Sequence, residues 1–401
     1  MGPVLLLDKS AIHSLSERES YWLDNLYFIN RVPPLFMEVM ADLKKKPSNL
    51  QLSADQVQAL ANKFPIMGVY QNTHHEECWQ GDLLGYPVPM DGRIPMPYGN
   101  EIIDSRGESG ILFDRSPEDK AMDRWKRGEF NEFENELADR WRESLKGIDL
   151  TAPSRAYAKM RRRGEEGIQS LEELVHVVRD ICEGKTGKYV LLKEVVTTLV
   201  PNNKKFLKQV YSRWSSCGRP EIFQYAPYAM HCFAVKTFFT MGLALNLIST
   251  RASNVIDLQY LYYLPFCSAF TSGDKFHKQL APLFMRKDQL FLNPEALKSD
   301  LKRIADDWDK KGEKSKGTAS FITKPWPGMI SEKVWDHCFG TSDWRYHTNT
   351  PRTLVSEEEQ AKSYERMKPV IDAVSEFSDK RRGKPLNEWD AALNPSPKDH
   401  I

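Results

Sequence analysis

The aliphatic run at the start of the chain, followed at once by an aspartate, restricts the fold more than any other stretch. Val4 to Leu7 contain no polar residue, so the run cannot alternate between a buried and a solvated face. Such strands are typical of the middle of a parallel sheet, which helices cover on both faces. Asp8 then lies at the carboxyl end of the strand, where open α/β sheets bind ligands. The run predicts an α/β fold, in which Asp8 either belongs to a site or caps a helix beginning near Ser10.

Composition sets broader limits on this chain of 401 residues, a length that suggests two or three domains. Its 56 Lys and Arg residues balance 55 Asp and Glu residues, so no overall charge indicates a polyanionic partner. The six cysteines include no CxxC pair, which favours free thiols in a reducing compartment. The chain starts directly with a strand and has no signal-peptide pattern, so we expect a cytoplasmic protein.

The most apolar stretch, Tyr225 to Ser249, approaches the length of a membrane span. It contains His231 and Lys236, however, and a lysine in the middle of a span is costly in a bilayer. The stretch is therefore predicted to be a buried helix, and no membrane partner is expected.

The expected secondary structure and the residue composition change along the chain. Ser10 to Asn30 is expected to be helical, and a second helix starts at the paired prolines Pro33 and Pro34. A loop rich in Pro and Gly follows, and then charged helices, the first of which is expected to start with a cap at Ser116 and to run to Gly147. We divide the chain into the first part of an α/β core (1–50), a mostly helical insertion (51–219), the second part of the core (220–290) and a C-terminal extension (291–401).

The opening pattern recurs near residue 270. A helix is expected over Asn254 to Leu264 and a short strand over Cys267 to Thr271. Asp274 follows this strand, with Ser272 two residues before it, just as Ser10 lies two residues from Asp8. The two strands are therefore expected to be parallel neighbours that bring Asp8 and Asp274 to one edge of the sheet.

Four acidic residues stand beside the apolar framework: Asp8, Glu38, Asp257 and Asp274. Carboxylates gathered in one crevice repel one another, and a hard divalent cation such as Mg²⁺ or Mn²⁺ is the natural counter-charge. A cation held in this way lowers the pKa of bound water and stabilises a phosphodiester transition state. The pattern therefore indicates hydrolysis of nucleic acid.

These residues resemble the motifs of the PIN-domain nucleases, a family that includes the ribonuclease toxins of toxin-antitoxin pairs. "LLLDKS" matches their opening strand with Asp8 and Ser10, and "PPLFMEVMADL" supplies Glu38 on an early helix. "DLQYLYYLPFCSAFTSGD" matches their third acid, helix and strand, and the motif of Ser or Thr, any residue and Asp. The resemblance covers roughly residues 1–50 and 220–290.

The resemblance implies a PIN-like parallel sheet and a metal-dependent nuclease that favours RNA over DNA, with a role related to toxins or defence. Asp8, Glu38, Asp257 and Asp274 would be both catalytic and metal ligands. Ser10, Ser272 and Asn254 would support the site, and Asp42 is an alternative to Glu38 one turn later. The substitutions Asp8→Asn and Asp274→Asn are each expected to abolish cleavage and to leave the fold intact. The rival hypotheses are a non-catalytic PIN-like scaffold that binds RNA or protein, and an unrelated α/β protein in which the carboxylates are structural caps.

Two histidine-containing segments are weaker candidates. "THHEECW" includes His74, His75 and Cys78, but no second pair with zinc-like spacing follows, so we interpret it as a surface loop. His277, three residues after Asp274, is expected either to approach a substrate phosphate or to lie on a helix face beside the crevice.

Basic residues either offer a route for a polyanion to the acidic site or form an ordinary solvated surface. The best candidate segment combines positive charge with an aromatic side chain, in the manner of surfaces that track a phosphate backbone and stack bases; it contains Lys204, Lys205, Lys208, Arg213 and Trp214. Basic runs also occur at Lys159 to Gly164 and Ser378 to Lys384. Partners would thus be nucleic acid and, still open, a second copy of the chain or a regulatory protein.

Overall fold

A computed structural model describes most of the chain. The described residues are 2–46, 48–65, 68–152, 155, 167–183, 187–310, 324–340, 357–382 and 384–395. The basic run Lys159 to Gly164 lies outside them.

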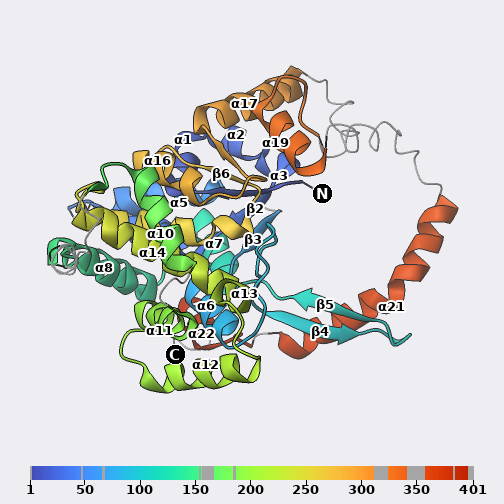
Figure 1. Cartoon of the computed structure of the whole chain (residues 1–401). Coiled ribbons are helices and arrows are strands. Elements are labelled where there is room, and N and C mark those ends of the chain that lie inside the picture. Colours follow the sequence, from blue (N-terminus) through green and yellow to red (C-terminus); the bar gives the residue numbers. More distant parts are fainter. Residues whose placement is uncertain are drawn as a thin grey trace.

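A five-stranded parallel sheet forms the centre of the molecule (Figure 1). Its strand order is β3-β2-β1-β6-β7, and β1 occupies the middle, as the all-apolar run predicted. All pairings within the sheet are parallel. The strands are β1 (Val4–Leu7), β2 (Phe28–Arg31), β3 (Val69–Gln71), β6 (Ala269–Thr271) and β7 (Leu290–Leu292).

The two strands that precede Asp8 and Asp274 are direct neighbours. Leu5 pairs with Ala269 and Leu7 pairs with Thr271, in parallel register. The expected arrangement is confirmed, and both aspartates follow strands that end at the same edge of the sheet. The strand order also reverses between β1 and β6, the type of position where open α/β sheets form their ligand crevice.

Helices pack on both faces of this sheet (Figure 1). In chain order they are α1 (Lys9–Ser14), α2 (Glu17–Ser20), α3 (Leu23–Leu26), α4 (Pro33–Ala41), the 3-10 helix η1 (Asp42–Lys44), α5 (Leu50–Asn62), α6 (His75–Leu83), α7 (Pro117–Lys126), α8 (Glu132–Lys146), α10 (Leu171–Cys182), α11 (Lys188–Leu199), α12 (Lys204–Ser216), α13 (Ile222–Tyr225), α14 (Pro227–Ala244), α15 (Asn254–Tyr262), the 3-10 helix η3 (Leu264–Phe266), α16 (Lys275–Phe284), α17 (Pro294–Lys310), α19 (Ile330–Phe339), α21 (Glu357–Arg381) and α22 (Glu388–Leu393). A separate antiparallel hairpin comprises β4 (Gly99–Ile103) and β5 (Ser109–Phe113) and contacts α21.

The central segment is not independent of the α/β core. β3 joins the sheet through β2, although it lies within the segment interpreted as an insertion. β7 begins at Leu290, the expected last residue of the core, and continues to Leu292. One cluster of buried apolar side chains runs from the sheet through Trp125, Leu174 and Val210. The helices of residues 51–219 therefore share a core with the sheet.

Several local expectations need correction. The segment from Ser10 to Asn30 is three short helices followed by β2, because Phe28 and Ile29 begin a buried strand run. The segment that starts at Ser116 has the expected cap, a capping box with Asp119, but it breaks into α7 and α8. The "THHEECW" segment is not a surface loop: it forms the start of α6, with His74 as the N-cap and His75 and Cys78 buried.

The apolar stretch from Tyr225 forms the buried helix α14, as predicted. Lys236 donates from Nζ to the Thr198 carbonyl at 2.7 Å, and His231 contacts the Leu261 carbonyl through Nε2. No helix among the described residues has the length and apolar character that a bilayer crossing requires.

Candidate acidic site

Asp8 is the most completely hydrogen-bonded of the four carboxylates. Its Oδ1 accepts the Ala11 backbone N–H at 2.8 Å, so Asp8 does cap α1. Ser10 donates from Oγ to the same carboxylate at 2.8 Å, and Ser272 donates to Oδ2 at 2.6 Å. The side chain of Asp8 thus ties the end of β1 to the end of β6.

Ser10, after β1, and Ser272, after β6, each form hydrogen bonds that connect the ends of these two strands. Ser10 accepts the backbone N–H of Gly273 at 2.8 Å, while Ser272 accepts that of Asp274 at 3.0 Å. Each hydroxyl also donates its proton to Asp8. This reciprocal bonding explains why a hydroxyl residue lies two positions from each aspartate.

His277 completes the cluster around Asp8, and it is fully buried. Its Nε2 lies 2.9 Å from the carbonyl of Asp257, which can only accept, so Nε2 carries a proton. Its Nδ1 lies 3.2 Å from Asp8 Oδ2 and 2.9 Å from Ser272 Oγ. Burial lowers the pKa of His277, but the hydrogen bond and charge of Asp8 outweigh this effect and hold that pKa above its ordinary value.

Asp8 and His277 therefore form a buried ion pair. Burial raises the pKa of Asp8, but His277 and the hydrogen bonds from Ser272 and Ala11 outweigh it, so that pKa lies below its ordinary value. His277 has no exposed surface and does not approach a phosphate in solution. Because a neutral amide in place of the Asp8 carboxylate would leave the imidazolium of His277 without its counter-charge, Asp8→Asn is now expected to destabilise the fold, contrary to the expectation from sequence.

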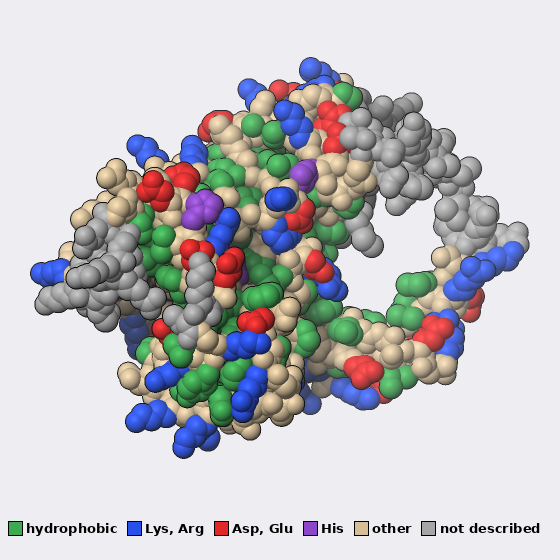
Figure 2. All heavy atoms as spheres, in the orientation of Figure 1, with side chains coloured by type: hydrophobic (Ala, Val, Ile, Leu, Met, Phe, Trp, Pro, Cys, Tyr) green, Lys and Arg blue, Asp and Glu red, His purple; other side chains and the backbone are tan. Residues whose placement is uncertain are grey.

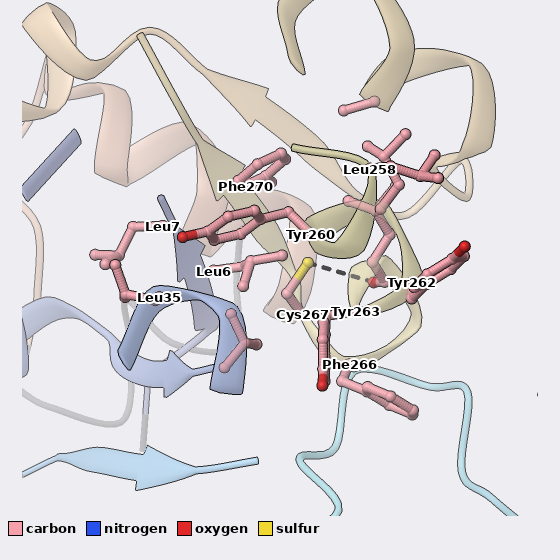
Figure 3. Packing of buried hydrophobic residues seen from close by; sticks show 14 of the residues in the cluster. Leu6, Leu7, Leu35, Leu258, Tyr260, Tyr262, Tyr263, Phe266, Cys267 and Phe270 are labelled. Atoms are coloured by element: carbon pink, nitrogen blue, oxygen red, sulfur yellow. Dashed lines mark hydrogen bonds between the residues drawn. The ribbon is translucent and has the colours of Figure 1, made fainter. Parts of the chain in front are cut away.

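Glu38 lies on α4 and contacts α15 through a single hydroxyl. Tyr260 donates to Glu38 Oε2 at 2.5 Å. Figure 3 shows the Tyr260 ring beside Phe270 and Leu6, with its hydroxyl directed toward Leu7. Burial raises the pKa of Glu38, and the negative charge of Asp8 adds to the increase. Glu38 is thus held close enough to Asp8 for their charges to interact.

The pKa of Asp257 is affected by the charges of the other three acids. Its pKa is raised to about 7, first by burial and then by the charges of Asp274, Glu38 and Asp8, against an opposing effect of His277. Asp274 caps α16, where its Oδ1 accepts the Phe276 backbone N–H at 2.7 Å. The four sequence-predicted acids therefore share one electrostatic environment.

A cavity of about 540 Å³ opens beside this cluster. Asp257, Asp274 and Asn254 line it. The amide nitrogen of Asn254 donates to the Ser249 carbonyl at 2.7 Å and to the Ser249 hydroxyl at 3.1 Å, which leaves its amide oxygen as the group available to a ligand. Asp8 and Glu38 are not among the described residues that line the cavity, but their charges act on Asp257.

The donor atoms suit a hard cation, but they are not pre-arranged as a closed metal site. Within the described residues, no group of three or more His, Cys, Asp or Glu side chains is placed to hold a metal ion. Asp8 is occupied by its own hydrogen bonds and Glu38 by Tyr260. Asp257 and Asp274, with the Asn254 amide oxygen, are the oxygens that would meet a cation entering the cavity.

No family model, curated protein or solved structure matches this chain.

Asp42, the alternative to Glu38, serves another purpose. It is buried and accepts Lys9 Nζ at 2.9 Å and an Arg142 guanidinium nitrogen at 3.2 Å. It therefore joins η1 to α1 and α8, and its charge is paired with these two cations. Glu38, one turn earlier, is the member that the cluster contains.

The basic helix α12 lies apart from the acidic cluster. Figure 1 places α12 at the bottom of the view and α1 and α16 near the top, and Figure 2 shows Lys and Arg side chains gathered over α12. Lys204, Lys205, Lys208 and Arg213 are exposed. Trp214 is buried, and its indole N–H donates to the Pro220 carbonyl, so this ring is not available for base stacking.

Two cations at the acidic cavity were not singled out from the sequence. Arg251 and Lys275 both line it, and both are exposed. Lys275 follows Asp274 directly, a signal that was available in the sequence. Arg251 lies in the turn before α15, and only the packing of that turn against α16 reveals its place.

Proposed function

We propose that this chain is a divalent-metal-dependent nuclease with a PIN-like acidic site, which cleaves phosphodiester bonds in nucleic acid, with RNA favoured over DNA. The observation that carries the proposal is that Asp257, Asp274 and Asn254 line one cavity beside the end of β6. The nearby charges of Asp274, Glu38 and Asp8 also raise the pKa of Asp257. Such coupling among four carboxylates at the edge of a parallel sheet favours a cation as the group that relieves it.

Asp257 and Asp274 would hold Mg²⁺ or Mn²⁺, with Asn254 as a third oxygen donor. Such an ion, when bound, supplies a water of lowered pKa and stabilises negative charge on the phosphoryl group. Arg251 and Lys275, which also line the cavity, would contact substrate phosphates. Asp8, Ser272 and His277 position Asp274 by fixing the turn after β6.

The experiment is cleavage of labelled single-stranded RNA and DNA with Mg²⁺, Mn²⁺ or a chelator, alongside direct Mn²⁺ binding by calorimetry. Asp257→Asn and Asp274→Asn should each reduce cleavage by about 100-fold or more and weaken Mn²⁺ binding. Asp55→Asn, which changes an exposed aspartate on α5, is the matched control and should behave as wild type. Absence of both cleavage and Mn²⁺ binding in the wild-type protein would overturn the proposal.

A non-catalytic scaffold is the second candidate. It is favoured by the full hydrogen bonding of Asp8 and by the Glu38–Tyr260 bond, which give two of the acids a structural purpose. This alternative predicts RNA or protein binding that is independent of divalent ions and unchanged in Asp257→Asn.

We also infer a reducing compartment such as the cytoplasm. All six cysteines are free thiols, and Cys78, Cys232 and Cys267 are buried.

A further inference from the structure

A second cavity lies at the carboxyl ends of β2 and β3. Its volume is about 870 Å³, within the range of roughly 300–1,000 Å³ that is usual for small-molecule sites. Pro33 and Pro34 after β2, and Asn72 and Thr73 after β3, form its floor. Side chains of α6, α8, α14, α15 and α22 form the walls.

Three residues that line this cavity each have a buried polar atom without a hydrogen-bond partner in the described part of the chain: Asn72 Oδ1, His75 Nδ1 and Glu118 Oε2. Buried polar groups are normally paired, and an unpaired one costs about 1–3 kcal/mol. Three such side chains, from the loop after β3 and from α6 and α7, line one cavity and indicate groups that a ligand would satisfy.

The same three side chains are firmly oriented by their other contacts. The Asn72 amide nitrogen donates to Asn30 Oδ1 at 3.0 Å, which fixes the amide oxygen on the opposite side. The His75 ring stacks on Tyr262 with centroids 4.8 Å apart. Glu118 accepts the Trp389 indole N–H on Oε1 at 2.9 Å, so Oε2 is left for another donor.

Buried contacts also hold the helix that carries Glu118. Arg31, at the end of β2, is 2 % exposed and donates to Asp119 at 2.6 Å and to Gln71 at 2.8 Å. Asp119 is also the capping-box residue of α7. The first turn of α7 is therefore fixed to the sheet, and the position of Glu118 is set before any ligand arrives.

The walls indicate a flat and largely apolar ligand. Aromatic rings surround the space, from Phe36, Tyr98, Trp141, Phe239, Tyr262 and Trp389. Rings of this kind stack well on planar heterocycles.

The charges of the lining residues disfavour an anionic group inside the cavity. Glu76, Glu77 and Glu118 line the cavity, and Lys236 is the one Lys or Arg among the lining residues that are described. The Lys236 ammonium is already bonded to the Thr198 carbonyl. Burial, with the nearby His74 and Lys236, lowers the pKa of His75 to about 3, so its imidazole is neutral.

We propose that this cavity binds an amino-substituted aromatic heterocycle of the nucleobase class, stacked among the aromatic rings. Its amino and ring N–H groups would donate to Glu118 Oε2 and Asn72 Oδ1, with His75 Nδ1 as a third partner. The base would come either from a free nucleoside or from a single-stranded nucleic acid. This inference does not rest on the proposed nuclease activity, because the cavity shares no catalytic acid with the first one.

The test is calorimetric titration of the full chain, without divalent ions, using adenosine, guanosine, cytidine, uridine and short single-stranded oligonucleotides. Nucleosides with an exocyclic amine should bind at least about tenfold more tightly than uridine. Binding of free nucleosides identifies them as the source, and binding confined to oligonucleotides identifies a base within a strand.

Two variants and one control locate the site. Glu118→Gln keeps an acceptor for Trp389 but turns Oε2 into a donor, and it should weaken binding at least about tenfold. Thr240→Phe fills the cavity from α14 and should abolish binding. Glu132→Gln removes the same charge from the exposed start of α8 and should leave affinity within about twofold, and unfolding curves verify that all three fold.

No binding of any nucleoside or oligonucleotide at millimolar concentration would overturn the proposal. It would be overturned equally by uridine binding as tightly as adenosine and cytidine, or by unchanged affinity in both Glu118→Gln and Thr240→Phe.

Discussion

The imidazole of His277 on α16 and the carboxylate of Asp8 at the end of β1 form a buried pair, with 3.2 Å between Nδ1 and Oδ2. The pair combines a raised histidine pKa with a lowered aspartate pKa. It therefore stabilises the folded chain while both groups are charged, above the ordinary aspartate pKa of 3.8 and below the ordinary histidine pKa of 6.5.

His277→Gln should lower the free energy of unfolding by about 3 kcal/mol near pH 5.5, because it leaves a buried aspartate without its cation. The difference from wild type should shrink as the pH rises through the raised pKa of His277, since the wild-type pair then loses its charge as well. Urea unfolding at pH 5.5 and 8.5 measures both effects. His176→Gln, at an exposed position on α10, is the control, and an equal loss at both pH values would contradict the ion pair.

Asp257→Asn should stabilise the fold. The raised pKa of Asp257 means that the folded state binds its proton more tightly than the unfolded state, so stability falls as the pH rises from 3.8 toward about 7. Removing the charge should add about 1–2 kcal/mol at pH 8 and little at pH 4. Thermal unfolding at the two pH values measures the change. A loss of stability at pH 8 would mean that the four acids do not repel one another.

Tyr260→Phe should cost about 2 kcal/mol of folding free energy, because it removes the hydrogen bond to Glu38 and leaves a buried carboxyl without a partner. Tyr211→Phe removes the same hydroxyl from an exposed position on α12 and should change the stability by less than about 0.5 kcal/mol. Equal effects of the two variants in chemical denaturation would show that the Glu38–Tyr260 bond contributes nothing.

Arg31→Met should destabilise the protein by about 3 kcal/mol, since Asp119 and Gln71 lose a buried cationic partner. It should also weaken nucleoside binding, because α7 is released from the sheet and Glu118 moves with it. Arg115→Met breaks an exposed ion pair with Asp123 on the same helix and should cost less than about 0.5 kcal/mol. Unfolding curves and titrations of both variants distinguish the two roles of Arg31.

The sequence was most informative where composition and position carried the same signal. Val4 to Leu7 could only be a central strand, and Asp8 with Ser10 repeated in Ser272 with Asp274, so the pairing of β1 with β6 was predictable. The strand β3 was not, because its three residues Val69–Gln71 are too short for a period to appear.

The other features of both sites depend on contacts between residues that are far apart in the sequence. Nothing near Glu38 in the sequence indicates Tyr260, and the choice between Glu38 and Asp42 depends on Lys9 and Arg142, which occupy Asp42 from other helices. His277 lies one turn after Asp274, but its pairing with Asp8 depends on how α16 packs on the sheet. The second cavity, at the carboxyl ends of β2 and β3, likewise forms only when α8, α14, α15 and α22 pack together.

The pairing of β1 with β6 also governs the order in which the molecule can assemble during synthesis. β2 follows β1 within a few dozen residues and covers one edge of it early, but the other edge waits for Thr271. At 5–20 residues per second, a ribosome needs roughly ten to fifty seconds to reach that strand after β1 has emerged. For this interval Leu5, Leu6 and Leu7 present an apolar strand with one unpaired edge, the kind of surface that templates aggregation. Folding yield should therefore depend on a chaperone, or on the early helices α1 to α4, sheltering β1 until synthesis has passed Thr271.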